Sequence, residues 1–228
     1  MTTRPAARSR RLPWICTTKG ISGLRPGLRT GGQATENTVL GPFHVAGAPF
    51  QEMGANINLD GKGTPLFQSG RVLDADGNPI ENAVIDTWMT NEDGFYDVQQ
   101  PDVQPEFNLR GRFRTGADGR YWFRGAKPRY YPVPTDGPVG EMLLGMGRHP
   151  YRPSHIHFIV TAPGYLPVTT HLFVRGDTYL ESDAVFGVKE SLIVDFIDHD
   201  DPMEAARLGL ANPFAVATFD FILQKRAG

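Results

Sequence analysis

Short apolar runs separated by turn-forming residues constrain the fold of this chain more than any other feature. From residue 36 to 200, runs rich in Val, Ile, Phe, Tyr and Trp alternate with clusters of Gly, Pro, Asp and Asn, and no long segment keeps a helical period. This pattern is typical of an all-β sandwich or barrel. We therefore expect an all-β, β-sandwich domain with long loops. Its predicted strands lie near Val72 and begin at Ala83, Arg120, His155, Thr169 and Ser191.

Turn and capping residues mark the ends of several predicted elements. Turn sequences begin at Asp74 (D-A-D-G-N-P), Gly116 (G-A-D-G-R) and Ala162 (A-P-G-Y), because Gly, Pro, Asn and Asp adopt turn conformations at low cost. One short helix is predicted over M-E-A-A-R-L-G-L, with Asp201 or Asp200 as its N-cap.

Length and composition indicate one sizeable globular domain. The chain has 228 residues and a net charge of -2. Its single cysteine, Cys16, excludes an internal disulfide and a cysteine-rich metal site. No apolar run reaches membrane-spanning length. We therefore expect no membrane span and a cytoplasmic protein.

The charge is distributed unevenly between a basic start and an acidic remainder. The first 35 residues carry seven Arg or Lys residues and no acid. We expect residues 1–33 to form a basic leader, either a disordered or remnant linker, which we favour, or an organelle-targeting peptide. Residues 34–228 then form the folded β-sandwich domain. Because this domain is acidic, nucleic acid is not an expected partner.

Three of the six histidines lie on two consecutive predicted strands. His155 and His157 are one residue apart, so they point to one side of an extended strand while Ile156 and Phe158 point to the other. His171 lies on the next strand, after a predicted hairpin turn. Two imidazoles on one face are well placed to share a metal ion. A bare H-x-H is equally compatible with two surface histidines.

Tyrosines in glycine- or proline-rich settings are the other candidate ligands. They are Tyr96 in D-G-F-Y-D-V-Q, and Tyr130 and Tyr131 in P-R-Y-Y-P-V-P. A phenolate is a hard, anionic oxygen donor, so it favours Fe(III) over Zn(II). Each tyrosine alone is more commonly a residue at the edge of the core. Arg152 precedes the histidines, where its guanidinium could meet an anionic substrate.

Six ordered blocks resemble the intradiol ring-cleavage dioxygenases. The similarity runs from about Ala34 to near the C-terminus, and it is closest to the hydroxyquinol 1,2-dioxygenase branch, with catechol and chlorocatechol 1,2-dioxygenases as relatives. The blocks are E-N-T-V-L-G-P-F-H-V, G-F-Y-D-V-Q, F-N-L-R-G-R-F-R-T, Y-P-V-P-T-D-G-P-V-G, G-R-H-P-Y-R-P-S-H-I-H-F and D-A-V-F-G-V-K.

The resemblance implies a metal centre and a reaction. It implies one non-haem Fe(III) per subunit, and a tyrosine directly before P-V-P selects Tyr131 over Tyr130. The implied ligands are Tyr96, Tyr131, His155 and His157. The expected reaction cleaves hydroxyquinol (benzene-1,2,4-triol) with O2 between its two adjacent hydroxylated carbons, giving 3-hydroxy-cis,cis-muconate or maleylacetate. Catechol and chlorocatechol are the alternative substrates.

The resemblance also implies roles around the metal. Arg152 is expected to stabilise negative charge on the substrate, and Tyr131 to take up a substrate proton. His171, where many catechol enzymes have glutamine, is expected to support the site. The substrate wall is expected to include Val39, Leu40, Gly41, Pro42 and Val185.

The chain departs from the family at its start. Relatives carry a helical N-terminal domain that forms much of their dimer interface, whereas only about 33 residues precede A-T-E-N-T-V-L-G-P here. We expect that domain to be missing or truncated, which leaves a homodimer as an open expectation. An inactive β-sandwich binding module is an alternative of another class. A zinc hydrolase using His155, His157 and a third ligand is a further one.

Overall fold

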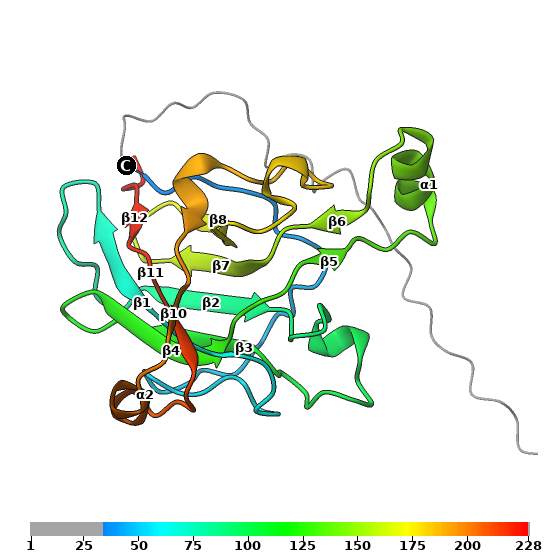
Figure 1. The fold of residues 1–228 in the computed structure, drawn as a ribbon. Helices are drawn as coiled ribbons and strands as arrows, with labels where there is room; N and C mark the ends of the chain where they lie inside the picture. Colours follow the sequence, from blue (N-terminus) through cyan, green and yellow to red (C-terminus); the bar gives the residue numbers. More distant parts are fainter. Residues whose placement is uncertain (1–33, 228) are drawn as a thin grey trace, which may run out of the picture.

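Two stacked β-sheets with long connecting loops form the body of the protein (Figure 1). The computed structural model describes residues 34–227, so the expected leader over residues 1–33 lies outside the described residues. The first sheet has the order β10-β11-β1-β12, and β4 also pairs with β1. Its strands are β1 (Pro65–Asp74), β4 (Arg120–Ala126), β10 (Ile197–His199), β11 (Phe214–Thr218) and β12 (Phe221–Leu223).

The second sheet carries the histidine strands. Its order is β3-β2-β7-β8-β9, with antiparallel pairing from β3 to β8 and parallel pairing of β8 with β9. The strands are β2 (Val84–Met89), β3 (Arg110–Arg114), β7 (His155–Thr161), β8 (Val168–Val174) and β9 (Ile193–Val194). The predicted all-β sandwich is confirmed.

Aromatic side chains fill the space between the sheets. Phe113 of β3 stacks on Phe123 of β4 with ring centroids 5.2 Å apart, and Phe158 of β7 meets Phe221 of β12 at 4.9 Å. All four side chains are fully buried. Because each aromatic ring removes a large apolar area from water, these pairs contribute much of the hydrophobic stabilisation between the two sheets.

Strand β7 is unusual because both of its faces are buried. Ile156, Phe158 and Val160 face the core between the sheets, as the alternation predicts. His155 and His157 point to the opposite face and are nevertheless only 1% exposed. A sandwich normally exposes that face to water. Loop segments that fold over the second sheet therefore cover the histidines.

A two-stranded ribbon and a helix project from one end of the sandwich (Figure 1). The ribbon pairs β5 (Tyr131–Pro132) with β6 (Tyr151–Arg152), so that Tyr131 lies opposite Arg152. Helix α1 (Pro138–Gly145) connects them. The sequence analysis was wrong here, because it predicted no helix in this region. The segment P-V-G-E-M-L-L-G is only eight residues long and contains one proline and two glycines, so its helix propensity is low and it is too short to establish a helical period.

The predicted C-terminal helix is confirmed as α2 (Pro202–Leu208). The carboxylate of Asp201, rather than Asp200, accepts hydrogen bonds from the amides of Met203 and Glu204. Only part of the predicted Ser191 strand forms, because η4 (Glu190–Leu192) precedes the short β9. Two more 3-10 turns are η2 (Asp97–Gln99) and η3 (Leu180–Ser182). No helix among residues 34–227 is long and apolar enough to cross a membrane.

Candidate metal centre

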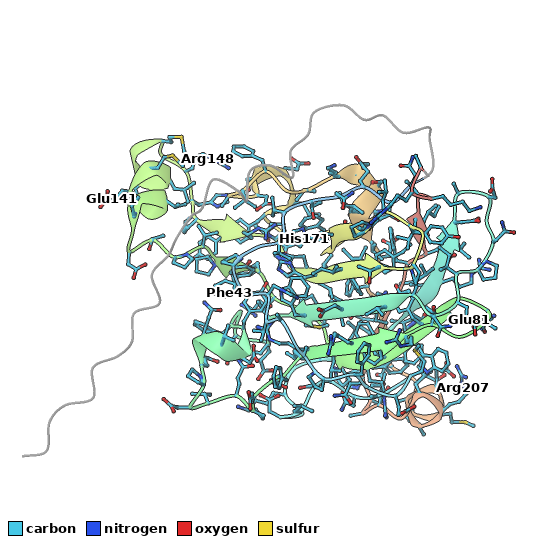
Figure 2. All side chains as sticks on the ribbon, turned by 180° about the vertical axis from the view of Figure 1, so that it is seen from behind. Phe43, Glu81, Glu141, Arg148, His171 and Arg207 are labelled. Carbon is cyan, nitrogen blue, oxygen red and sulfur yellow. The ribbon has the colours of Figure 1, made fainter. Side chains whose placement is uncertain are left out.

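Strands β7 and β8 bring three histidines together. His157 lies directly opposite His171 in the antiparallel ladder, and His155 lies two residues before His157 on the same face. The Nε2 atoms of His155 and His157 are 3.1 Å apart. One ring nitrogen of each residue lies within 4.8 Å of those of the other two, and all three side chains are buried. We call these residues the three-histidine cluster (Figure 2 labels His171).

Two tyrosines converge on the cluster from outside the second sheet. The Tyr96 hydroxyl lies 2.9 Å from Nε2 of His157. The Tyr131 ring meets the Tyr96 ring edge-on at 5.3 Å and lies 5.6 Å from the His155 ring. Both tyrosines are at most 2% exposed. Oxygen and nitrogen donors from four distant parts of the chain therefore share one buried space.

The side chains of the neighbouring residues Tyr130 and Tyr131 point in different directions. The half-buried Tyr130 ring packs at 5.0 Å against Tyr179 and at 5.8 Å against Tyr151. Gly94 makes room for this segment, because its φ is +83° and a Cβ there would lie 2.8 Å from the Tyr130 carbonyl oxygen. The glycine thus lets the Tyr96 loop and the Tyr131 strand lie against each other.

Hydrogen bonds orient the imidazole rings. Nδ1 of His155 lies 2.6 Å from the Pro153 carbonyl, which only accepts, so Nδ1 carries the proton and Nε2 presents its lone pair to the site. Nδ1 of His171 lies 2.6 Å from the Thr38 hydroxyl. Nε2 of His171 is buried with no hydrogen-bond partner. Because buried polar atoms in proteins are usually hydrogen-bonded, this nitrogen is a candidate to bond to a ligand bound next to it.

The electrostatics keep the histidines neutral. Burial lowers the pKa of all three well below the ordinary value, and the nearby Arg152 guanidinium adds to this effect. Burial also raises the pKa of the Tyr96 phenol well above its ordinary value, and Tyr131 adds to the rise. A phenolate in this space therefore needs the compensating charge of a cation. Neutral imidazoles and phenolates together suit a hard, highly charged metal ion better than Zn(II).

Arg152 borders the cluster from strand β6. Its Nη1 group donates a hydrogen bond to Nε2 of His155 at 3.3 Å. Burial alone would lower the pKa of Arg152, but Tyr131 and Asp183 outweigh it, so this pKa lies above its ordinary value. The guanidinium is thus a permanent positive charge next to His155 and Tyr131.

The segment over residues 38–43 forms part of the wall around the cluster. Its first residue, Thr38, contacts His171, and its last, Phe43, stacks on Tyr96 at 4.6 Å. A Cβ on Gly41 would lie 3.1 Å from Cε1 of His157. This glycine therefore lets the backbone approach the histidine. The predicted wall residues Val39, Leu40 and Pro42 lie in this same segment.

Four residues of the site escaped the sequence analysis. Besides Thr38 and Phe43, Trp88 stacks on the His157 ring at 4.6 Å, and Asp183 pairs with Arg152 at 3.2 Å. Each lies in one of the strands or motif blocks already noted, but a single residue there carries no signal of its orientation. The predicted wall residue Val185 follows Asp183 and is half-buried.

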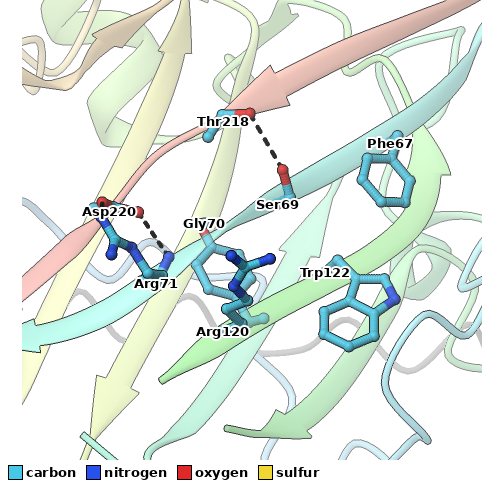
Figure 3. A pocket seen from close by; sticks show the side chains of 9 residues that line it. Phe67, Ser69, Gly70, Arg71, Arg120, Trp122, Thr218 and Asp220 are labelled. Carbon is cyan, nitrogen blue, oxygen red and sulfur yellow. Dashed lines mark hydrogen bonds and ion pairs between the residues drawn. The ribbon is translucent and has the colours of Figure 1, made fainter. Parts of the chain in front are cut away.

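A hollow on the first sheet offers no comparable chemistry (Figure 3). It lies over β1 and β4, where Arg71 pairs with Asp220 at 3.1 Å and Ser69 lies 3.2 Å from Thr218. The Tyr121 hydroxyl there donates to a backbone carbonyl. These contacts already occupy the side chains of Ser69, Arg71 and Tyr121. A second hollow borders the candidate centre, between the Tyr96 loop and the β5–β6 ribbon.

Known proteins resemble this chain over most of its described length. The family described as dioxygenase matches residues 39–225. Hydroxyquinol 1,2-dioxygenase of Rhizobium sp. (strain MTP-10005) is 59% identical over 193 residues, which span 84% of this chain and 65% of that relative. The solved structure of hydroxyquinol 1,2-dioxygenase from Pseudomonas putida DLL-E4 has a TM-score of 0.80 at 46% identity, covering 87% of this chain and 69% of that one. Catechol 1,2-dioxygenase from Acinetobacter radioresistens has a TM-score of 0.81 at 36% identity, covering 86% and 64%.

Proposed function

The chain belongs to the dioxygenase family, and from that premise we propose that it is a non-haem Fe(III) intradiol dioxygenase that cleaves hydroxyquinol with O2. The observation that carries the proposal is the shared, buried space that receives two tyrosine hydroxyls and the lone pairs of two neutral imidazoles. Such a donor set matches the chemistry that a ferric ion prefers. The name and 59% identity of the Rhizobium relative support hydroxyquinol over catechol or chlorocatechol as the substrate.

We assign the iron to Tyr96, Tyr131, His155 and His157. The contacts of Tyr96 with His157, and of His155 with His157, support this assignment because their donor atoms are about 3 Å apart. That spacing is the separation expected between neighbouring ligands of one ion whose bonds are about 2 Å long. When bound, the ferric ion supplies Lewis acidity and makes the aromatic ring reactive toward O2.

The chain's own residues supply proton transfer and charge stabilisation. Tyr131 belongs to the donor set and lies opposite Arg152, where its phenolate oxygen would accept the proton of a substrate hydroxyl and become a neutral phenol. The guanidinium of Arg152 would stabilise negative charge on the bound ring. Nε2 of His171, buried and without a partner, would hydrogen-bond to the bound substrate or oxygen. Val39, Leu40, Gly41, Pro42 and Val185 are our candidates for the substrate wall.

Reconstitution with ferric iron, followed by oxygen uptake, tests the proposal. Ferric–phenolate coordination absorbs visible light, so the loaded chain should be red and should consume O2 with hydroxyquinol faster than with catechol or chlorocatechols. A colourless protein would refute the proposal. A red protein that consumes no O2 would instead support a binding module that has lost turnover.

A matched pair of tyrosine variants tests the ligand assignment. Tyr131→Phe should shift the visible band strongly, because it removes one phenolate from the donor set. Tyr130→Phe is the control, since its ring packs against Tyr151 and Tyr179 outside the cluster. A shift in the Tyr130 variant alone would show that the assignment is wrong.

A further inference from the structure

We infer that Asp183 is a positioning residue that fixes the Arg152 guanidinium and the Val185 loop as a single unit. The inference rests on the proposed function, because it concerns how that site is oriented toward its substrate. Asp183 contributes no donor atom to the cluster itself. It acts through the residues that its carboxylate holds.

On one side, the carboxylate of Asp183 accepts hydrogen bonds from two of the three nitrogens of the Arg152 guanidinium. Nε of Arg152 donates to Oδ1 at 3.2 Å, and Nη2 donates to Oδ2 at 3.4 Å. Both side chains are at most 3% exposed. A two-point contact between planar groups fixes orientation as well as distance. The remaining nitrogen, Nη1, is therefore the one that is directed at His155.

On the other side, the same two oxygens hold the loop that follows. Oδ1 accepts the amide of Val185 at 3.2 Å, and Oδ2 accepts the amide of Gly187 at 2.9 Å. Between them, Phe186 has a φ of +55°, which is uncommon for a residue with a side chain. The loop thus keeps a costly conformation with the help of the carboxylate, and that conformation sets where Val185 lies.

Close packing leaves this unit little freedom to rearrange. A Cβ on Gly187 would lie 3.1 Å from Nη2 of Arg152 and 3.2 Å from Oδ2 of Asp183. The glycine therefore allows the loop backbone to lie against the ion pair. Movement of the guanidinium and movement of the loop are sterically linked at this point.

The chemistry of the contacts requires a carboxylate. All four groups that face Asp183 here are N–H donors, two from Arg152 and two from the loop. An asparagine amide offers one acceptor oxygen and one NH2 group, which would face a donor. Asp183→Asn therefore keeps the side-chain volume, but its NH2 group faces N–H donors and cannot accept the hydrogen bonds that one carboxylate oxygen accepted. It also leaves the buried Arg152 charge without its counter-ion.

Steady-state kinetics of the iron-loaded variant tests the inference. Asp183→Asn should retain its iron and its visible band while kcat for hydroxyquinol falls by about 10- to 100-fold. The ratio of kcat/KM for hydroxyquinol to that for catechol should change by about 3-fold or more, because Val185 moves with the loop. Gly187→Ala keeps the charges but crowds the ion pair. It should also lower kcat for hydroxyquinol, and it should shift the ratio of kcat/KM values in the same direction as Asp183→Asn does.

Asp195→Asn is the matched control, because Asp195 pairs with Arg175 at 2.8 Å on the exposed surface. It should leave both quantities unchanged. If wild type is active and Asp183→Asn keeps its kcat and its substrate ratio, the inference is refuted. Parallel loss of iron and activity would also refute it, because it would indicate a structural role alone.

A readout without iron or substrate separates this inference from the proposed function. Asp183→Asn and Arg152→Lys are made singly and together, and unfolding is measured by denaturant. Strongly non-additive effects on stability support the unit even if the wild-type chain neither becomes red nor consumes O2. Additive effects of the two substitutions on stability would overturn the inference even if the wild-type protein is active.

Discussion

Replacing Arg110 by methionine should destabilise the protein strongly, because this buried guanidinium joins two walls of the metal site. Nε of Arg110 donates to Asp97 at 2.6 Å, and Nη1 donates to the Phe43 carbonyl at 2.7 Å. Asp97 follows the proposed ligand Tyr96, and Phe43 stacks on the Tyr96 ring. A single cation therefore ties the Tyr96 loop to the segment that covers it.

The magnitude follows from the burial of both charges. The side chains of Arg110 and Asp97 are 2% and 6% exposed. Truncating one partner of a buried pair leaves the other charge unpaired, which typically costs about 3–5 kcal/mol. Methionine fills much of the volume, so a cavity adds little to this cost. Restoring neutrality with Asp97→Leu in the same chain should recover part of the loss, with a coupling energy of about 1–3 kcal/mol.

Urea unfolding of the iron-free single and double variants measures these free energies. Arg207→Met is the control, because Arg207 pairs with Glu204 on the exposed face of α2 and its loss should leave the unfolding free energy almost unchanged. A loss below about 1 kcal/mol for Arg110→Met, or additive effects in the double variant, would show that the pair does not stabilise the site.

Three further perturbations test other parts of the structure. Burial lowers the pKa of the three-histidine cluster well below 6.5, so the unfolded state takes up protons first and iron-free protein should lose stability as pH falls below 6.5. A urea midpoint that stays unchanged as the pH falls from 7 to 5 would contradict this. Gly70→Ala should cost at least about 3 kcal/mol, because its Cβ would lie 1.7 Å from the Phe219 carbonyl, whereas Gly116→Ala should change the thermal midpoint little. Asp201→Ala should lower the unfolding free energy by about 1 kcal/mol through loss of the α2 cap, and an unchanged value would refute the capping role.

Local pattern predicted much of the fold. The alternation of Ile156, Phe158 and Val160 with the histidines placed β7 and its two faces, and the turn at Pro163–Gly164 joined it to β8. These features depend on neighbouring residues alone, because side chains alternate along an extended chain. The α1 segment was not predicted, because it is only eight residues long and contains a proline and two glycines, so the sequence gives no sustained helical period there.

The sequence predicted residues of the candidate site only where they lie in a recognisable motif. The histidine pair had a geometric basis in the sequence, whereas Tyr96 and Tyr131 were identified through the resemblance to a family. Thr38, Phe43, Trp88 and Asp183 were missed. Thr38 and Trp88 contact the histidines directly, whereas Phe43 contacts Tyr96 and Asp183 contacts Arg152, in each case from a segment far apart in the chain.

The sequence by itself therefore determined the five longest strands (β1, β2, β4, β7 and β8), the turns, helix α2 and the same-face placement of His155 and His157. Each of these follows from the backbone geometry of a few consecutive residues. Only the tertiary structure decided that both faces of β7 are buried and that Tyr131 lies among the donors. It also decided that Asp183 holds Arg152. Packing of distant loops sets these features, and the positions of such loops depend on the whole core rather than on any local period.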